Sequence, residues 1–526
     1  MRAFASLIDA LVFTPSRNGK IRLLADYFAQ TPDPDRGWAL AALTGGLSFA
    51  EAKPAAIRGL VMQRVDPVLF GWSYDFVGDM AETISLIWPQ RPDAGSPPRL
   101  SEVVDALSAA HRGSALGLVE AWLDRLDAPG RHALIKLITG SMRVGVSARL
   151  AKTALASLGA PGVDEIEEVW HGLTPPYGPL FDWIEGRVPR PPVSHGAGFR
   201  PLMLANPLED AEVGGFEIGD YRAEWKWDGI RVQLAARGGE RRIWSRTGEE
   251  ISRGFPEIAD AMGFDAVVDG ELLVVRDGTV APFNDLQQRL NRKAVTAKLL
   301  EGHPAHVRLY DILFEGADDL RGLPFDERRR RLQSWFERVR PALMDVSPLI
   351  PFEGWDDLAR LRDGARNAAI EGLMLKRGDS SYVAGRPKGP WFKWKRGPLT
   401  LDTVLMYAQR GHGKRSSFYS DFTFGTWRDG ELVPVGKAYF GFTDEELTQL
   451  DRWVRNNTVR RYGPVREVTP GLVLEVAFDS VHRSSRHKSG VAMRFPRIHR
   501  IRWDKPPAEA DRLETLERMI VGEAEA

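Results

Sequence analysis

One segment of this 526-residue chain alternates charged and aromatic side chains: Glu224-Trp225-Lys226-Trp227-Asp228-Gly229-Ile230-Arg231. Successive side chains of a β-strand point to opposite faces, so Glu224, Lys226 and Asp228 share one face and the tryptophans share the other. The tryptophan face can be buried, whereas the other face presents an amine between two carboxylates. Gly229 allows a turn or the close approach of a ligand. An amphipathic edge strand would show the same alternation, so this segment alone leaves a purely structural role open.

Three further segments place charged residues on one face of a predicted strand: Val267-Val268-Asp269-Gly270-Glu271, Glu371-Gly372-Leu373-Met374-Leu375-Lys376 and Trp391-Phe392-Lys393-Trp394-Lys395-Arg396. In the first, Asp269 and Glu271 lie together beside a glycine that opens space. In the second, Glu371 stands at the head of a buried strand. In the third, Lys393 and Lys395 share a face. A ladder of cross-strand salt bridges would explain each segment equally well.

The composition is that of an ordinary globular protein, with 43% hydrophobic and 27% charged residues, and it excludes disorder as the dominant state. The 71 basic residues balance 71 acidic ones, which argues against a uniformly basic surface for nucleic acid. The chain has no cysteine, which excludes disulfides, a thiolate nucleophile and cysteine-based zinc or iron–sulfur sites.

No run of about 18 apolar residues occurs, so we expect no membrane-spanning segment. Residues 1–13 have a short apolar part and carry Asp9, which is typical of an amphipathic helix and not of a signal peptide. We therefore expect a cytoplasmic protein, associated with the nucleoid if it is bacterial.

Basic residues concentrate in two windows. Val481–Lys505 holds eight Lys or Arg against one acid, Asp504, and Tyr382–Arg396 holds five with no acid. Such clusters favour phosphate or nucleic acid as a partner, although a solvated basic face has the same composition. Lysine supplies only 15 of the 71 basic residues, and unlike arginine it can lose its proton and act as a nucleophile. The lysines in patterned segments are therefore candidates for chemistry: Lys226, Lys376, Lys393, Lys395 and Lys505.

The periodicity divides the chain into three parts. Up to about residue 185, apolar residues recur three and four apart, which predicts helices. Residues 186–201 are rich in proline and glycine and indicate a linker. Beyond the linker, short β-branched and aromatic strands alternate with some helices, and from Leu401 short strands dominate, as in a small barrel. We predict three domains, over residues 1–195, 196–398 and 399–526.

The order and spacing of these motifs resemble those of an ATP-dependent DNA ligase, a member of the covalent nucleotidyltransferase superfamily. The lysine motif of that family, E-x-K-x-D-G-x-R, is matched by Glu224, Lys226, Asp228, Gly229 and Arg231. Further elements follow in the order of the family: Ser245-Arg246-Thr247-Gly248, Asp269-Gly270-Glu271, Tyr310-Asp311-Ile312-Leu313, Glu371-Gly372 with Lys376, Lys393-Trp394-Lys395, and Arg494-Phe495-Pro496-Arg497 continuing to Arg500, Arg502, Asp504 and Lys505. K-x-D-G alone is a short pattern, whereas the ordered set is specific. The resemblance covers nearly the whole chain and is weakest in residues 1–130.

The resemblance implies a three-domain fold: an all-α DNA-binding domain, an α+β nucleotidyltransferase domain of the ATP-grasp-like ligase type, and a C-terminal β-barrel OB-fold. It implies an enzyme that seals 5′-phosphate/3′-hydroxyl nicks in duplex DNA through a lysyl-AMP intermediate and a DNA-adenylate, in DNA repair, replication or recombination. The implied cofactors are ATP and Mg²⁺, for which Mn²⁺ can substitute. The implied partner is nicked double-stranded DNA, and we expect a monomer.

By resemblance, Lys226 is the catalytic nucleophile. The residues implied to bind the nucleotide are Glu224, Arg231, Arg246, Glu271, Tyr310, Lys376, Arg386, Lys393, Lys395, Arg502 and Lys505. Among them, Glu224 and Tyr310 would hold adenine, and Arg502 and Lys505 would reach the β,γ-phosphates from a mobile C-terminal domain. Glu271 and Glu371 are the implied ligands of Mg²⁺, a hard cation that is held by few protein oxygens together with water.

The resemblance extends to Gly140-Ser141-Met142-Arg143-Val144-Gly145-Val146-Ser147, which is similar to the Arg–apolar–Gly turn of the family's helical DNA-binding domain. Ser147 would cap the following helix, whose free N–H groups suit a DNA phosphate. A helix connection without a ligand is equally consistent with this segment. The implied DNA contacts are Arg143, Arg497 and Arg500.

Two positions depart from the family pattern. Tyr310 stands where many relatives have phenylalanine, and stacking on adenine should survive this change. Trp394 is bulkier than the usual aliphatic residue between the two lysines, but we predict that it points to the opposite face.

Other functions stay open on the sequence alone. An RNA ligase or an RNA-capping guanylyltransferase uses the same lysine–nucleotide chemistry, although the long helical N-terminal part and the arginine-rich ending favour a DNA ligase. A catalytically inactive DNA-binding scaffold would need neither Lys226 nor the acidic pairs, and a metal-dependent nuclease would not need a lysine between tryptophans. The absence of cysteine disfavours the NAD-dependent ligase class, which carries a cysteine zinc site.

Overall fold

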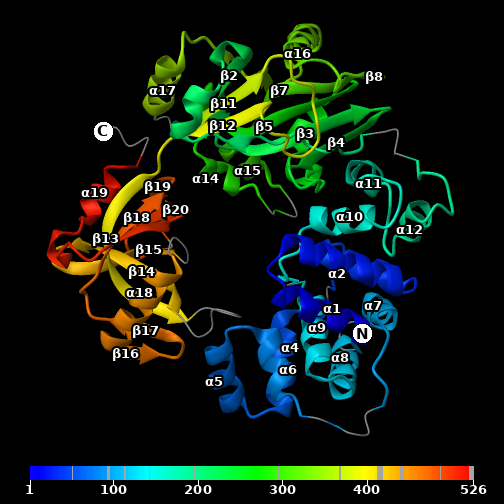
Figure 1. The fold of residues 1–526 in the computed structure, drawn as a ribbon, viewed down its shortest axis with the longest axis vertical. Helices are drawn as coiled ribbons and strands as arrows, with labels where there is room; N and C mark the ends of the chain where they lie inside the picture. The colour runs from blue at the N-terminus through cyan, green and yellow to red at the C-terminus, as the bar shows by residue number, and fades with distance from the viewer. Residues whose placement is uncertain are drawn as a thin grey trace. The chain divides into compact units, whose positions relative to one another are not determined.

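The computed structural model (Figure 1) describes most of the chain, namely residues 1–49, 51–89, 91, 95–111, 114–140, 142–192, 197–290, 292, 295–365, 369–410, 419–438, 443–485 and 487–520. Ser141, Arg486 and the predicted domain boundary between residues 195 and 196 lie outside these residues.

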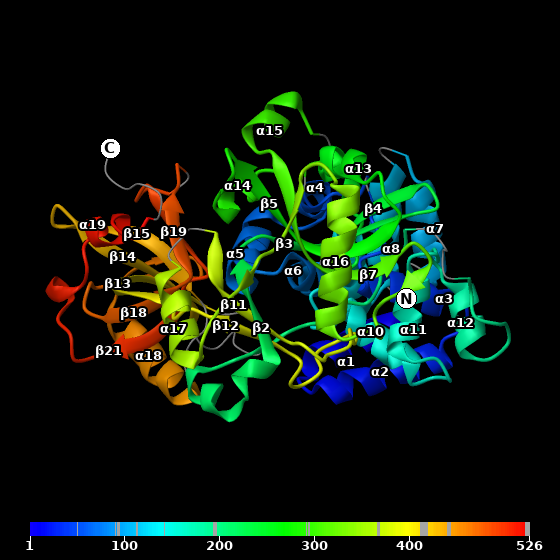
Figure 2. The same cartoon turned by 90° about the horizontal axis from the view of Figure 1, so that it is seen from above.

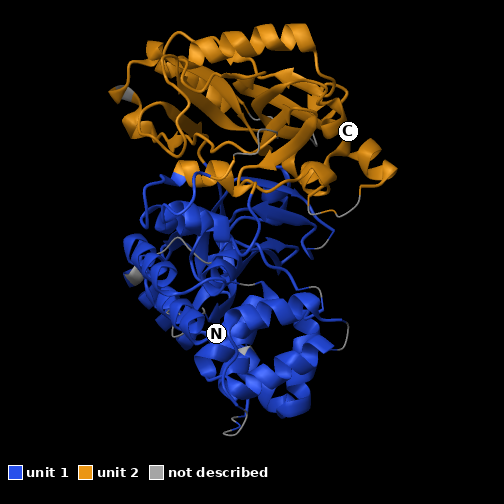
Figure 3. Ribbon diagram, turned by 90° about the vertical axis from the view of Figure 1, so that its right-hand side faces the viewer, with its two compact units in different colours: residues 1–163, 173–190, 398–520 blue, residues 164–172, 191–397, 521–526 orange. Residues whose placement is uncertain are grey.

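Residue contacts divide the chain into two compact units, which Figure 3 shows in different colours. The first unit consists of Met1–Val163, Leu173–Arg190 and Pro398–Ile520, and the second consists of Asp164–Gly172, Pro191–Gly397 and the undescribed Val521–Ala526. The main stretch of the second unit nearly coincides with the middle domain predicted from the sequence. The division into three domains stays a prediction.

The first third of the chain is helical, as its periodicity predicts. Its helices are α1 Arg2–Phe13, α2 Arg17–Gln30, α3 Asp35–Leu43, α4 Pro54–Arg64, α5 Pro67–Val77, α6 Met80–Ile87, α7 Leu100–Ala109, α8 Ser114–Arg125, α9 Ala128–Thr139, α10 Ala148–Ala156, α11 Val163–Trp170 and α12 Gly178–Ile184. The apolar α9 is largely buried and packs against α1 and α6. Across the described residues, no helix is both long enough and apolar enough to cross a membrane.

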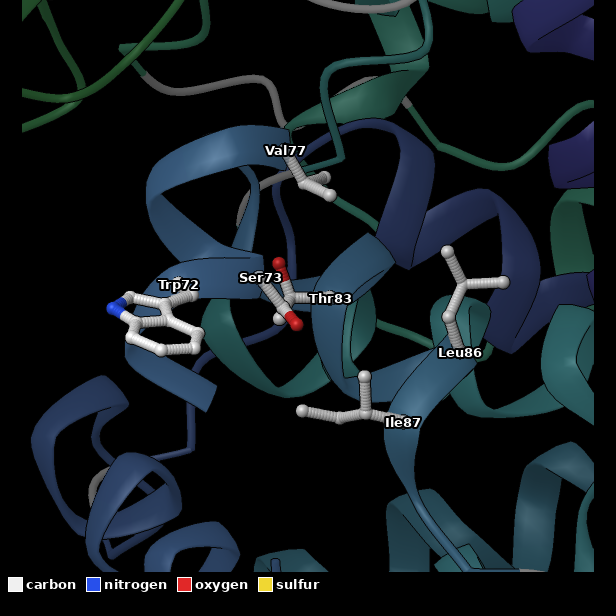
Figure 4. A pocket seen from close by; sticks show the side chains of 6 residues that line it. All are labelled: Trp72, Ser73, Val77, Thr83, Leu86 and Ile87. Carbon is white, nitrogen blue, oxygen red and sulfur yellow. The ribbon is translucent and has the colours of Figure 1, made fainter. Parts of the chain in front are cut away.

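An open groove lies between α5 and α6 (Figure 4). It has a volume of about 300 Å³, and its walls are formed by Trp72, Ser73, Val77, Thr83, Leu86 and Ile87. Trp72 is 73% exposed and Leu86 is 66% exposed. None of the site residues predicted from the sequence lines this groove.

From Leu399 onward the chain forms a β-rich domain that is consistent with the predicted OB-fold. Its strands are β13 Leu399–Arg410, β14 Tyr419–Arg428, β15 Glu431–Ala438, β16 Thr458–Tyr462, β17 Val465–Val468, β18 Val473–Phe478, β19 Ser480–Arg483, β20 Val491–Arg494 and β21 Arg497–Arg502, and its helices are α18 Asp444–Asn456 and α19 Leu513–Glu517. The long β13 pairs with β18 through its first half and with β14 and β17 through its second half. The domain has a large apolar core and a smaller cluster of Val404, Val473 and Ala510.

The second unit is an α+β structure built on two sheets, as predicted. One sheet has the order β1-β12-β11-β2-β10, and the other has the order β4-β3-β5-β7-β8 with β6 and β9 beside it. The strands are β1 Asn206–Pro207, β2 Tyr221–Trp227, β3 Ile230–Arg237, β4 Glu240–Ser245, β5 Ala266–Arg276, β6 Thr279–Val280, β7 Ala305–Glu315, β8 Asp318–Asp319, β9 Met344–Val346, β10 Leu349–Ile350, β11 Ile370–Arg377 and β12 Trp391–Lys395. The helices are α13 Pro256–Ala261, α14 Phe283–Gln287, α15 Ala297–Gly302, α16 Phe325–Val339 and α17 Trp355–Gly364. The amphipathic α16 packs against β7, as Figure 2 shows.

The tryptophans of β2 are half-buried, so the predicted burial of their face is only partial, whereas Glu224 on the charged face is 2% exposed. Trp225 packs against the apolar cluster around Leu373, and Trp227 packs beside Leu273. The guanidinium of Arg308 lies 4.2 Å from the centroid of a Trp227 ring, a cation–π contact. The strand ends at Trp227, so Asp228 follows it instead of belonging to it.

Two glycines allow main chain to approach closely around this strand. A Cβ atom at Gly372, whose φ is +151°, would overlap the carbonyl oxygen of Trp394 and lie 2.8 Å from Cα of Lys395. A Cβ atom at Gly229 would lie 2.8 Å from Cγ of Glu271. Any larger residue at these two positions would push apart the segments that carry the charged side chains.

We predict that Gly372→Ala destabilises the second unit by about 2 kcal/mol or more, because the new methyl group overlaps main chain that cannot move aside and φ is unfavourable for an L-residue. Urea denaturation followed by tryptophan fluorescence measures the shift in the transition midpoint. Gly219→Ala is the matched control, since a Cβ atom there would meet nothing within 4 Å. Equal midpoints for the two variants would contradict the prediction.

Candidate active site

Lys226 on β2 faces the carboxylate of Glu371 on β11. The strands are antiparallel, and Lys226 lies opposite Gly372. The Nζ atom of Lys226 lies 2.5 Å from Oε2 of Glu371, and Nζ of Lys395 on β12 lies 3.1 Å from the same oxygen. Three residues predicted from separate segments therefore meet on three adjacent strands, and the salt bridges offered as the structural alternative are formed by the same side chains.

The carboxylate that pairs with Lys226 is neither of the two that the strand alternation placed on its face. Alternation along the strand placed Lys226 between Glu224 and Asp228, but the anion paired with it is Glu371. The register of the ladder shifts between Ile370 and Gly372, and such an irregularity re-aims a side chain. Simple strand periodicity cannot anticipate this change.

Glu371 is an anion at neutral pH. Burial alone would raise the pKa of its carboxyl group, but the charges of Lys226 and Lys395 outweigh burial and hold this pKa at about 2. The ion pair thus fixes the Lys226 ammonium at one point of the sheet surface.

Glu224 lies in a buried group of charges behind the Tyr310 ring. Its side chain is 2% exposed and pairs with two cations: Nη1 of Arg329 lies 3.0 Å from Oε1, and Nζ of Lys376 lies 2.6 Å from Oε2. The same Lys376 nitrogen lies 4.5 Å from the centroid of the Tyr310 ring. Burial lowers the pKa of Lys376, against the opposing effect of the Glu224 charge. The three residues predicted around adenine or its neighbourhood therefore form one contiguous group.

Arg231 is held by Asp269. Its Nη2 atom donates to Oδ2 of Asp269 at 2.7 Å, and its Nη1 atom donates to the carbonyl oxygen of Met203 at 2.6 Å. The Tyr382 hydroxyl donates to the same Asp269 oxygen at 2.6 Å. Asp269 is completely buried, so this carboxylate orients Arg231, whose guanidinium lies 5.8 Å from the centroid of the Tyr310 ring.

The carboxyl group of Glu271 is perturbed in the direction opposite to that of Glu371. Burial raises its pKa to about 7; the charges of Lys226 and Arg231 oppose this shift, and those of Glu371 and Asp228 add to it. A carboxyl group near other anions is ionised more readily when a cation binds beside it.

The pair of Glu271 and Glu371 fits a divalent cation. Both side chains are carboxylates, which Mg²⁺ prefers, and the charge of Glu371 is one of those that raise the pKa of Glu271. Within the described residues, no group of three or more His, Asp or Glu side chains could hold a metal ion by protein ligands alone. An ion at this pair would therefore complete its coordination with water and with the phosphates of a nucleotide.

Further cations, Lys226 among them, lie near Lys393. Burial lowers the pKa of Lys393, and repulsion from Arg386, Lys395, Lys226 and Arg246 lowers it further. These side chains belong to separate segments named in the sequence analysis, and they lie close together in the folded protein. Such a concentration of positive charge favours the binding of phosphate groups.

Trp394 supports the strand that carries two of these lysines. It is buried on the face opposite Lys393 and Lys395, as predicted, and its Nε1 atom donates to Oδ1 of Asp210 at 2.7 Å. The guanidinium of Arg362 on α17 lies 4.2 Å from the centroid of a Trp394 ring and also binds Asp210. The bulky residue that departs from the family pattern thus has its own supporting contacts.

The two predicted β,γ-phosphate residues lie in the other unit. Nη1 of Arg502 and Nζ of Lys505 lie 3.3 and 2.7 Å from Oδ2 of Asp402, and Arg502 also pairs with Asp504. All ion pairs that the structure describes for these two cations lie within the β-rich domain.

The three residues predicted to contact DNA differ in their exposure and in their ion pairs. Arg143 and Arg500 are exposed, whereas Nη1 of Arg497 lies 3.2 Å from a carboxylate oxygen of Asp479. The Arg–apolar–Gly turn after Arg143 is fixed by Lys20, whose Nζ atom donates to the carbonyl oxygen of Val144 at 2.7 Å.

The cap of the following helix is formed as predicted. The side-chain oxygen of Ser147 accepts a hydrogen bond from the N–H of Leu150 at 3.2 Å, at the start of α10.

Sequence reasoning missed the arginines of α16. The run Arg328-Arg329-Arg330-Arg331 is the available signal, because a helix that buries Phe325 and Leu332 turns the intervening positions 328 and 329 inward as well. Arg328 pairs with Asp311, and both side chains are completely buried.

Family models match two parts of the chain. Residues 202–395 match the ATP-dependent DNA ligase domain, and residues 415–505 match the C-terminal region of ATP-dependent DNA ligases.

Related proteins extend over nearly the whole chain. A probable DNA ligase of Koribacter versatilis is 32% identical, over 99% of this chain and 96% of its own length. DNA ligase 1 of Korarchaeum cryptofilum is 31% identical, over 98% of this chain and 97% of its own length. The solved structure Pmar-Lig_PreS3 shares the fold, with a TM-score of 0.59, 16% identity and coverage of 95% of this chain and 99% of its own. The chain that carries Lys226 on this charged sheet surface therefore belongs to the ATP-dependent DNA ligase family.

Proposed function

We propose that this ligase seals 5′-phosphate/3′-hydroxyl nicks in duplex DNA by carrying AMP on Lys226. The observation that carries this proposal is the position of Lys226, which is anchored by the ionised Glu371 and belongs to a group of cations near Lys393 that is suited to phosphate. RNA ligases and capping enzymes use related chemistry, and the match of the chain to DNA ligases along nearly its full length favours DNA.

In the first step, the unprotonated Lys226 amine attacks the α-phosphorus of ATP. A P–N bond forms, the bond between the α- and β-phosphates breaks, and pyrophosphate leaves. We assign Lys393 and Lys395 to neutralising the charge on the α-phosphate, and Glu224 and Tyr310 to holding adenine. Positioning and neutralisation of charge supply most of the catalysis in phosphoryl transfer.

In the second step, the 5′-phosphate of the nick attacks the lysyl-AMP and releases the lysine nitrogen. In the third, the 3′-hydroxyl attacks the 5′-phosphate, the phosphodiester bond forms, and AMP leaves. We assign Arg231 and Glu271 to the ribose region, Arg246 and Arg386 to phosphate, and Lys376 to the base of the adenine site.

We also propose that Glu271 and Glu371 hold Mg²⁺, or Mn²⁺ in its place. When bound, the ion would neutralise negative charge on the reacting phosphates. Arg502 and Lys505 would bind the β,γ-phosphates through movement of the C-terminal domain, and Arg143, Arg497 and Arg500 would contact the DNA backbone. The monomeric state and the cytoplasmic location stay predictions.

Lys226→Arg should abolish the transfer of label from α-labelled ATP to the protein. Arginine keeps the positive charge beside Glu371 but cannot act as a nucleophile at neutral pH. A denaturing gel after incubation with labelled ATP and Mg²⁺ measures the covalent label. Retention of label by this variant, or its absence in the wild type, would refute the assignment of Lys226.

The double substitution Arg502→Ala with Lys505→Ala should block self-adenylylation yet spare the sealing of nicks that already carry AMP, because only the first step needs the β,γ-phosphates. Gel assays of the two half-reactions measure this. Arg500→Ala is the matched control on the same domain: it should leave self-adenylylation intact and weaken the DNA step, with a smaller deficit at higher salt because one phosphate contact fewer makes DNA binding less salt-dependent. Equal losses in both steps for the double variant would rule out the proposed division of labour.

Replacing the two carboxylates should change the stability of the metal-free protein with different dependence on pH. The pKa of Glu271 in the folded protein, about 7, lies above its ordinary value of 4.5, so its contribution to stability is complete below pH 4.5 and is lost as the pH rises through 7. Glu271→Gln should therefore stabilise the protein relative to wild type more at pH 8 than at pH 5.

Glu371→Gln is the control for this comparison. The pKa of Glu371 is about 2 in the folded protein, so the group is ionised in both folded and unfolded states across most of that pH range. Its replacement should destabilise the protein by nearly the same amount at pH 6 and pH 8. Thermal unfolding without nucleotide or Mg²⁺ measures both effects, and a pH-independent effect of Glu271→Gln would contradict the prediction.

A further inference from the structure

We propose that Arg329 on α16 is a positioning residue that sets the preference of this ligase for ATP over GTP. It acts through Glu224, which it fixes as a hydrogen-bond acceptor for the amino group of adenine. This inference rests on the proposed function, in which Glu224 meets the base.

Arg329 is anchored at both ends of its guanidinium. Nη1 binds Oε1 of Glu224 at 3.0 Å, and Nη2 donates to the carbonyl oxygen of Ser347. Ser347 is itself fixed, because its N–H donates to the carbonyl oxygen of Leu309 at 2.7 Å. Arg329 is 5% exposed, so this geometry is held inside the protein and is not an exchangeable surface contact.

With two cations bound to its carboxylate, Glu224 acts as a hydrogen-bond acceptor. The carboxylate accepts from Arg329 on one oxygen and from Lys376 on the other, and an ionised carboxylate is an acceptor only. Adenine presents an amino donor at position 6, whereas guanine presents a carbonyl acceptor there. A fixed acceptor at this point therefore favours adenine and repels guanine, and it does so only while its orientation is held.

The neighbouring Arg328 provides an internal comparison. It is also buried on α16 and also binds one carboxylate, that of Asp311, with distances of 2.9 and 3.0 Å from its Nε and Nη2 atoms. Asp311 follows Tyr310, whose ring would stack on either purine. Arg328 thus supports the strand segment of Tyr310, which would not distinguish adenine from guanine. Arg329 supports Glu224, which would distinguish them.

The test measures kcat/KM for self-nucleotidylylation with ATP, GTP and purine riboside 5′-triphosphate, which lacks the 6-amino group. In the wild type, removal of that amino group should be costly. In Arg329→Met, the ATP-to-GTP ratio should fall about tenfold or more, and removal of the amino group should cost correspondingly less, since coupled groups are not additive. The ATP-to-GTP ratio of Arg329→Lys should lie between those of the wild type and Arg329→Met.

Matched variants distinguish a positioning role of Arg329 from the general effect of removing a buried ion pair. Arg328→Met should raise KM for ATP and GTP alike and leave their ratio unchanged. Arg330→Met should change neither, because Arg330 is exposed and pairs with Glu327 on the same helix.

An unchanged ratio in Arg329→Met, or an equal fall in Arg328→Met, would overturn the inference. If Arg329→Met does not fold, the ratio of Arg329→Lys decides: a reduced ratio supports the inference, and a wild-type ratio overturns it. A wild type that takes no label from ATP would instead refute the proposed function.

Discussion

The antiparallel pairing of β2 with β11 is the interaction on which the rest of the site depends. It sets Lys226 opposite Gly372, and the irregular register next to that glycine presents Glu371 to the lysine. The close contact of Gly372 with β12 then brings Lys393 and Lys395 to the same surface. A lysine, its counter-ion and two further cations are thus placed by main-chain pairing, which is stiffer than any arrangement of mobile surface loops.

The sequence alone predicts the elements that follow from local periodicity. The helical first third, the strands around Lys226, the burial of Trp394 and the cap at Ser147 all belong to this class. The partner of Lys226 could not be predicted, because it depends on a shift of register between two strands that are far apart in the chain. The cations on Glu224 come from α16 and β11, so they too required the packing of the folded protein.

In the second unit, each described buried carboxylate near the proposed adenine site pairs with a cation. Through two successive residues, α16 binds Glu224 in one sheet and Asp311 in the other. Leaving one partner of such a pair unmatched in the interior is strongly unfavourable, so these contacts constrain how the helix and the two sheets can fit together. The balanced net charge of the chain therefore hides local concentrations of cations, such as the group near Lys393.

Because Lys226 and Glu371 form an ion pair, the charge around Glu371 depends on whether Lys226 carries AMP. A lysine joined to AMP loses its positive charge and gains a negatively charged phosphate group, so Glu371 loses the cation nearest to it and keeps Lys395. The surface that meets a polyanion then differs electrostatically before and after the first reaction. On the proposed mechanism, this surface is less positive once Lys226 carries AMP, so the attraction for DNA then depends more on the remaining cations such as Lys395.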